Sequence, residues 1–147
     1  MKKPAEDHPT GMTHRDTLKM DWSRGHNGTI HNGISRIGYM TGGEQAHWVD
    51  EEIPFVLNDK AKKFISDGDE PFFLYYSFHD IHVPRVPNEK FQGASGMGPR
   101  GDAIVQMDWA VGDIVSALEE KGLLESTLVI FISDNGPVLD DGYFDQA

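Results

Sequence analysis

Two uninterrupted apolar runs dominate the pattern of hydrophobic and polar positions, and each leads directly into polar side chains. The first covers residues 72–82 (FFLYYSFHDIH), and the second covers residues 128–137 (LVIFISDNGP). A strand that is buried on both faces reads as a continuous apolar run, and ligands of open α/β sheets bind where parallel strands end. The pattern therefore predicts that His82 and Asp134 share one edge of a parallel sheet.

Apolar positions at helical spacing predict a helix before each strand. The first helix covers residues 50–68, with Pro54 in its first turn and Gly68 as its stop. The second covers residues 102–121, with Asp102 as an N-terminal cap or first-turn acid. Strands over about residues 71–78 and 128–133 then complete a strand, crossover helix, strand unit of a parallel sheet. The fold class is α/β.

The remaining part of the chain, residues 1–49, is polar and rich in turn signals such as Asn32-Gly33. We expect an irregular wrapping segment with one brief strand near Ile34. An irregular stretch of this length is uncommon inside a compact domain. Moreover, two strands that are apolar on both faces need neighbouring strands and covering helices. Both features predict that the chain belongs to a larger folded body.

Composition narrows the classes of partner. The 147 residues suffice for one domain, and 13 Lys plus Arg against 24 Asp plus Glu give a net charge of −11, which disfavours nucleic acid. The chain has no cysteine, so it offers no disulfide, thiolate zinc site or cysteine nucleophile. No apolar run approaches the roughly 20 residues that span a bilayer, and residues 1–10 lack a signal-peptide core. We expect no membrane partner.

The dipeptide Asp134-Asn135 offers a carboxylate and an amide oxygen at a predicted strand end. Such hard oxygen ligands suit Ca²⁺ or Mg²⁺. The alternative is a plain turn, because Asp, Asn and Gly are common turn formers. Two ligands also fall short of the roughly six that these cations take, so further ligands must come from elsewhere.

His79 and His82 lie in the loop after the earlier strand. Histidine can donate a proton to a leaving oxygen or hold an anion, because its ordinary pKa lies near physiological pH. The alternative for either residue is a solvated or structurally hydrogen-bonded side chain. Residues beside the same predicted edge, Arg85, Asp140, Asp141 and Tyr143, could shape a sugar or aryl pocket, although surface loop residues are more often simply solvated.

Four segments in this order resemble the sulfatase family, particularly arylsulfatase-like members of the alkaline-phosphatase-like superfamily. They are HNGISRIGYMTGG, PFFLYYSFHDIHVPRVPNEKF, GPRGDAIVQMDWAVGDIVSAL and LVIFISDNGPVLDDGY. The resemblance implies a fragment of an alkaline-phosphatase-like sandwich, with residues 1–147 as the central part of the catalytic domain. It further implies that Asp134 and Asn135 are ligands of an active-site calcium, and that His82 rather than His79 is the proton donor.

The resemblance also implies hydrolysis of sulfate esters, on a sulfated small molecule or carbohydrate, by a formylglycine made in a Cys/Ser-x-Pro-x-Arg motif. This sequence contains no Cys, and no Ser stands two residues before any of its eight prolines. The nucleophile is therefore not encoded here, and we expect the isolated chain to be inactive. Family members are typically exported, which implies a periplasmic or secreted parent enzyme.

Two other functions stay open on the sequence. One is a phosphatase or phosphodiesterase of the same superfamily, with a different nucleophile and more metal ligands. The other is a non-catalytic module that associates with itself through unpaired sheet edges. Association that depends on concentration but is indifferent to calcium would distinguish the second from an enzyme fragment.

Overall fold

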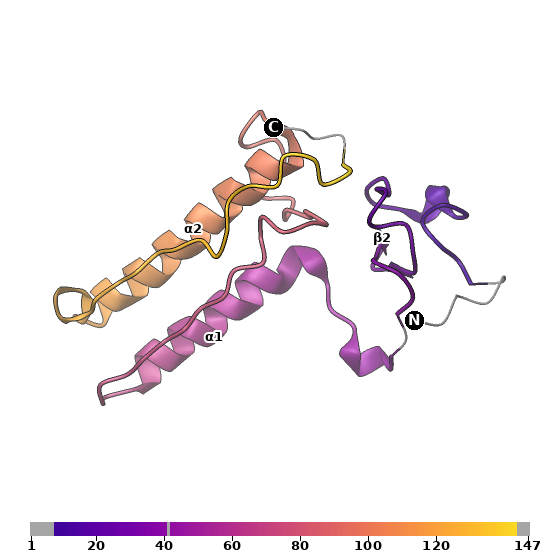
Figure 1. The fold of residues 1–147 in the computed structure, drawn as a ribbon. Helices are drawn as coiled ribbons and strands as arrows, with labels where there is room; N and C mark the ends of the chain where they lie inside the picture. The colour runs from indigo at the N-terminus through magenta and orange to yellow at the C-terminus, as the bar shows by residue number, and fades with distance from the viewer. Residues whose placement is uncertain (1–7, 41, 144–147) are drawn as a thin grey trace. The chain divides into compact units, whose positions relative to one another are not determined.

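The computed structural model describes residues 8–40 and 42–143. Two compact units make up the chain (Figure 1). The first contains the described residues up to Asp50 together with those from Val138 onward, and the second runs from Glu51 to Pro137.

The first unit is built around a short antiparallel hairpin. Strand β1 (Ile30–His31) pairs with β2 (Ile34–Ser35), and the isolated bridge Thr10–Thr29 extends the pairing. Asn32 and Gly33 form the connecting turn with φ of 53° and 72°, the left-handed conformation that a two-residue Asn-Gly hairpin turn requires. Ile34 is fully buried and forms the centre of this unit. The predicted brief strand is therefore present at this position.

Three short 3₁₀ turns occur in the remaining irregular part of the described chain. They cover Arg15–Thr17, Glu44–Ala46 and Asp50–Glu52, and none of the three exceeds three residues. The turn at Asp50–Glu52 leads directly into the first long helix. No helix of the described residues is both long and apolar enough to cross a membrane.

Two helices that lie side by side form the body of the second unit (Figure 1). Helix α1 covers Ile53–Asp67 and α2 covers Gly98–Glu120, followed by a 3₁₀ turn at Leu124–Ser126. Their contact buries small and aliphatic side chains, which are Ala61, Ile65, Ala103, Ala110 and Leu118. Both helices carry proline in the first turn, where the missing N–H is not needed.

Helix α1 agrees with the predicted range, whereas α2 begins four residues earlier than predicted. Asp102 lies inside α2 and is buried. Its carboxylate accepts hydrogen bonds from the backbone N–H groups of Gly93 (2.7 Å) and Ser95 (2.9 Å), and from the Ser95 hydroxyl (2.7 Å). Asp102 therefore organises the loop that precedes the helix instead of capping the helix itself.

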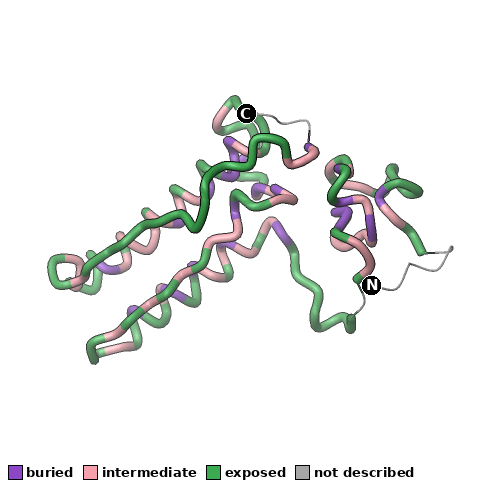
Figure 2. Tube along the Cα trace, viewed as in Figure 1, coloured by how far each residue is buried: buried purple, intermediate pink, exposed green. Residues whose placement is uncertain are grey.

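The two apolar runs are extended but unpaired within the described residues. Along residues 71–78 exposure alternates, so that Phe73 and Tyr75 remain 87% and 77% exposed while Phe72 and Tyr76 are partly covered. Residues 128–133 are exposed throughout, and this part of the tube is green in Figure 2. Neither run makes a backbone hydrogen bond that defines a strand. Strand pairing needs neighbouring strands, and the described residues supply none here.

Candidate active site

A ring contact in the second unit brings the ends of the two apolar runs together. The ring centroids of Phe78 and Phe131 lie 6.2 Å apart. Phe78 is four residues before His82, and Phe131 is three residues before Asp134. The two polar clusters therefore follow runs that touch at Phe78 and Phe131, while a shared sheet edge for His82 and Asp134 stays a prediction.

The loop that carries the histidines is tied to α2 through Asp80. This carboxylate is buried and accepts a hydrogen bond of 2.7 Å from the side-chain amide of Gln106. A backbone hydrogen bond of 3.1 Å from the His82 N–H to the His79 carbonyl closes the turn between the two histidines. The position of the loop is thus set by a buried contact, while its tip stays accessible.

His82 is exposed at the tip of this loop. Its Nδ1 lies 2.7 Å from the Val83 carbonyl oxygen. A carbonyl can only accept, so Nδ1 carries the proton and Nε2 takes no part in this contact. A histidine held in this way can present its Nε2 to a substrate, and in its protonated form it can donate from there.

His79 is placed differently. Its Nδ1 is buried without a hydrogen-bond partner among the described residues and lies 3.9 Å from an Asp80 carboxylate oxygen, too far for a hydrogen bond. The ring is therefore turned toward the protein at this atom. Of the two candidates, His82 is the more exposed.

Asp134 and Asn135 form an exposed bend directly after the second apolar run. The Ser133 hydroxyl donates a hydrogen bond of 2.7 Å to the Asn135 carbonyl and stabilises this bend. Both side chains present oxygen atoms to solvent, which fits a hard cation such as Ca²⁺. Among residues 8–40 and 42–143 no group of three or more His, Asp or Glu side chains is arranged to hold a metal. The two residues thus fit part of a ligand shell.

A partly buried polar network supports the extended run that leads to His82. The Tyr76 hydroxyl donates to Asn58 Oδ1 (2.8 Å), Asn58 Nδ2 donates to Asp113 (2.9 Å), and Lys62 Nζ lies 2.9 Å from Asp113. Burial, followed by the charges of Asp80 and Asp113, raises the pKa of Tyr76 to about 12. Burial opposes ionisation of Asp113, but hydrogen bonds from Lys62 and Asn58 outweigh it and lower the pKa.

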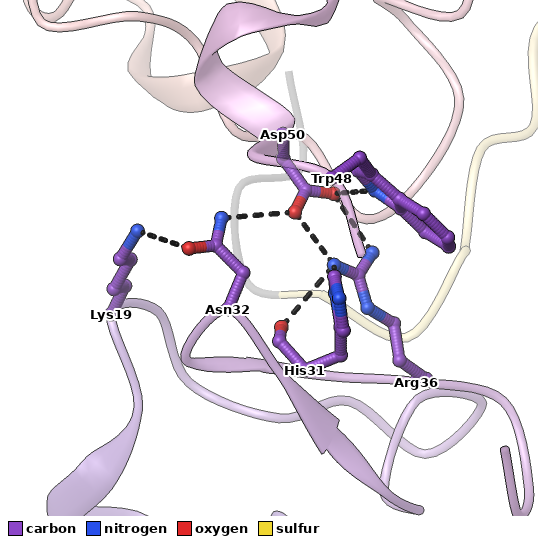
Figure 3. A network of polar contacts seen from close by, with 6 residues as sticks. All are labelled: Lys19, His31, Asn32, Arg36, Trp48 and Asp50. Atoms are coloured by element: carbon purple, nitrogen blue, oxygen red, sulfur yellow. Dashed lines mark hydrogen bonds and ion pairs between the residues drawn. The ribbon is translucent and has the colours of Figure 1, made fainter. Parts of the chain in front are cut away.

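A second polar network fixes the first unit (Figure 3). The guanidinium of Arg36 donates to both carboxylate oxygens of Asp50 at 2.9 and 2.6 Å, and both side chains are buried. Asn32 Nδ2 donates to the same carboxylate at 3.1 Å, and Lys19 donates to Asn32 Oδ1 at 2.8 Å. Burial raises the pKa of Asp50, but the hydrogen bonds from Arg36 and Asn32 more than offset this, so the pKa is lowered.

Aromatic rings cover one side of this network. The ring of His31 lies 4.7 Å from those of His47 and Trp48, and the Arg36 guanidinium is 5.4 Å from the Trp48 ring. Burial, together with the charge of Arg36, lowers the pKa of His31. No local signal predicts the Arg36–Asp50 pair, because the two residues are 14 positions apart and meet only after folding.

The remaining candidates near the predicted edge divide into buried and exposed residues. Arg85 is buried and its Nε donates to the Ile81 carbonyl at 3.3 Å, while Tyr143 is buried with its ring 5.7 Å from that of His26. Asp140 is exposed and accepts from the Arg24 guanidinium at 3.3 Å. Arg85 thus stabilises the histidine loop, and Asp140 belongs to the first unit.

Comparison with known proteins decides the family. A sulfatase family model matches residues 10–147. The chain belongs to the sulfatase family. An N-acetylgalactosamine-6-O-sulfatase of Bacteroides thetaiotaomicron is 54% identical over 142 residues, which are 96% of this chain and 28% of the relative. Human arylsulfatase A is 51% identical over 69 residues, 47% of this chain and 14% of the relative.

A solved structure gives the same answer for the fold. The solved structure is a protein from work on the metabolism of multiple glycosaminoglycans by Bacteroides thetaiotaomicron. It superposes on this chain with a TM-score of 0.89, and the two sequences are 52% identical. The match covers 99% of this sulfatase chain and 30% of that protein. The α/β class and the alkaline-phosphatase-like fold are thereby confirmed. The chain spans less than a third of the length of these two Bacteroides relatives.

Proposed function

We propose that this chain supplies part of the active site of a sulfatase that hydrolyses a sulfate ester on a carbohydrate. The observation that carries the proposal is the contact between Phe78 and Phe131, from which the His82 loop and the Asp134–Asn135 bend both start. Membership of the sulfatase family favours sulfate over the phosphate esters of related enzymes.

His82 acts as the proton donor in this proposal. Its Nδ1–H is bonded to the Val83 carbonyl, so the ring must be protonated on both nitrogens for its Nε2–H to give a proton to the oxygen of the departing alcohol, after which the ring is neutral. Asp80, held by Gln106, keeps the loop in place and acts as a positioning residue. His79 has no part in the reaction, since its Nδ1 is turned into the protein.

Asp134 and Asn135 would hold a calcium ion together with ligands from outside this chain. Their carboxylate and amide oxygens are the ligand type that Ca²⁺ prefers. When bound, the cation supplies positive charge against the sulfate oxygens. The two side chains are exposed and stand next to each other at a bend, so they can bind it without rearrangement of a buried group.

The proposed substrate is based on the relative that aligns with the largest share of this chain. Because 96% of this chain aligns with the N-acetylgalactosamine-6-O-sulfatase at 54% identity, we propose a 6-sulfated N-acetylgalactosamine unit as the substrate. Because members of the sulfatase family are typically exported, we also propose that the enzyme works in the periplasm or after secretion.

A chimera tests the proposal. The 142 matching residues of the Bacteroides relative are exchanged for those of this chain, and release of sulfate from 6-sulfated N-acetylgalactosamine is measured with and without a calcium chelator. We expect the chimera to release sulfate and the chelator to abolish this activity. His82→Ala should lower the rate at least about a hundredfold, whereas the matched variant His79→Ala should keep a near-normal rate. An inactive but folded chimera, or equal losses for both histidines, would contradict the proposal.

The chain alone is expected to release no sulfate, because it encodes no Cys/Ser-x-Pro-x-Arg motif. The same assay on the purified chain of 147 residues checks this. Calcium-dependent hydrolysis by the isolated chain would show that the nucleophile lies within it and would overturn the assignment of roles given above.

A second role, self-association, is favoured by the exposed apolar runs. Leu128 and Ile132 are 83% and 76% exposed, and the backbone groups of residues 71–78 and 128–133 are unpaired within the described residues. Such edges pair readily with other strands. Sedimentation of the chain at several concentrations tests this role. Association that calcium does not alter would support a self-associating module, and a monomer at all concentrations would exclude it.

A further inference from the structure

A shallow polar depression lies in the first unit, where the segment after residue 137 folds against the N-terminal part of the chain. It has a volume of about 410 Å³ and is lined by Arg24, Gly25, Asp140, Asp141 and Gly142. The Arg24 guanidinium lies 3.4 and 3.3 Å from the two carboxylate oxygens of Asp140, although 116 positions separate the two residues. None of the residues that line it takes part in the proposed reaction.

The backbone on the Asp140 side is fixed by local hydrogen bonds. The Gly142 N–H donates to Asp140 Oδ1 at 3.1 Å, and the Tyr143 N–H donates to Asp141 Oδ1 at 3.0 Å. Gly142 has a φ of 84°, and a Cβ there would lie 3.4 Å from the Arg24 backbone nitrogen. Both carboxylates are thus oriented by the turn that carries them.

The backbone on the Arg24 side is fixed independently. Ser23 and His26 exchange two backbone hydrogen bonds of 3.2 and 3.1 Å, and both residues are buried. The ring of His26 in turn contacts the ring of the buried Tyr143. The two sides of the depression are therefore held together below the surface, without the Arg24–Asp140 pair.

The Arg24–Asp140 pair itself is exposed and long. The side chains are 80% and 62% exposed, and an ion pair of this kind contributes little to stability. Its distances exceed the roughly 2.7–2.9 Å of strong charge-assisted hydrogen bonds. A hydroxyl group can accept from the guanidinium and donate to the carboxylate at the same time, so it can bridge a pair with this spacing.

We propose that this depression is a subsite for the neutral hydroxyl groups of the sugar that bears the sulfate ester, an inference that rests on the proposed function. Its lining has two carboxylates and one guanidinium, so its net negative charge repels a further sulfate or a uronate. Sugar hydroxyls can form hydrogen bonds with both kinds of group. Asp140 is six residues after Asp134, so the chain keeps the subsite within roughly 20 Å of the bend that would hold calcium.

Nuclear magnetic resonance on the chain of 147 residues tests the subsite without any need for catalysis. N-acetylgalactosamine is titrated into the ¹⁵N-labelled chain up to high millimolar concentration. We expect the Gly25 and Gly142 amide signals to shift and to reach saturation. Arg24→Ala should raise the dissociation constant at least about tenfold. The matched control Lys63→Ala removes an exposed cation from an ion pair on α1 and should leave the titration unchanged.

Three outcomes overturn the subsite: no shift at Gly25 and Gly142, shifts that Arg24→Ala leaves unchanged, or stronger binding of sulfate or glucuronate than of the neutral sugar. The chimera gives a second readout. In the chimera, Arg24→Ala should raise KM for the sulfated sugar about tenfold and leave hydrolysis of 4-nitrophenyl sulfate unchanged. An equal loss of activity on both substrates would refute the subsite. Sugar binding by an inactive chimera would instead refute only the proposed function.

Discussion

The side-chain amide of Gln106 joins both ends of the histidine loop to α2. Its Nε2 donates to the buried Asp80 carboxylate at 2.7 Å, and its Oε1 accepts from the Asn88 backbone N–H at 2.8 Å. Gln106 is itself 1% exposed. One side chain in the helix therefore sets where the loop with His82 begins and where it ends.

Gln106→Ala should destabilise the second unit, because it leaves a buried carboxylate and a backbone N–H without their partner. We expect a loss of about 1–3 kcal/mol in the free energy of unfolding, measured by urea denaturation. Gln45→Ala is the matched control, since Gln45 is exposed. In the chimera, Gln106→Ala should also lower kcat. Unchanged stability and kcat would show that the loop is held by other contacts.

The Arg36–Asp50 pair should be the most sensitive contact of the first unit. Asp50→Ala leaves the buried guanidinium uncompensated, so we expect a loss of about 3–5 kcal/mol in urea denaturation followed by Trp48 fluorescence. Arg15→Ala breaks an exposed pair with Asp21 and should cost below about 1 kcal/mol. Equal effects of the two variants would refute the importance of burial here.

Acid should weaken the same contact. The pKa of Asp50 is lower in the folded chain than its ordinary value of 3.8, so its contribution to stability is complete above that value. It is lost as the pH falls from 3.8 through the folded pKa, since the unfolded chain then binds the proton more readily. The conservative variant Asp50→Asn should lack this part of the acid dependence, measured as unfolding midpoints between about pH 5 and pH 2.

The hairpin turn provides a test on the backbone alone. Gly33 has a φ of 72°, and a Cβ there would lie 2.8 Å from Lys19 Cγ. Gly33→Ala should therefore lower the free energy of unfolding by about 1–2 kcal/mol. Gly43→Ala is the control, because a Cβ at Gly43 meets nothing within 4 Å and its φ is −80°. Equal stability of the two variants would mean that the turn is flexible.

Local signals in the sequence predicted the parts of the fold that depend on neighbouring residues. Pro54 and Gly68 mark the ends of α1, and Asn32-Gly33 marks the hairpin. The start of α2 was placed late because Asp102 resembles a cap, whereas the proline at position 99 was the better signal. The Asp102 carboxylate instead accepts hydrogen bonds from the loop that precedes α2.

Contacts between distant positions could not be predicted from the sequence. The Arg36–Asp50 pair, the Gln106–Asp80 anchor and the Arg24–Asp140 pair each join residues that meet only after folding. The order of strand, helix and strand predicted that the two apolar runs belong to one parallel sheet. The described residues show a ring contact between the runs but no pairing, because pairing requires strands that these residues do not contain.

The Tyr76 hydroxyl should titrate late, and its titration should report the packing beside the histidine loop. Burial, with the charges of Asp80 and Asp113, raises its pKa to about 12. Stability that depends on the neutral hydroxyl is therefore complete below pH 10 and is lost as the pH rises from 10 toward 12. Tyr76→Phe should remove the last phase of tyrosinate absorbance, while Tyr75→Phe, at an exposed neighbouring position, should keep it. If Tyr76→Phe left that phase in place, the hydroxyl would not be buried against Asn58, and the run that leads to His82 would not rest on α1.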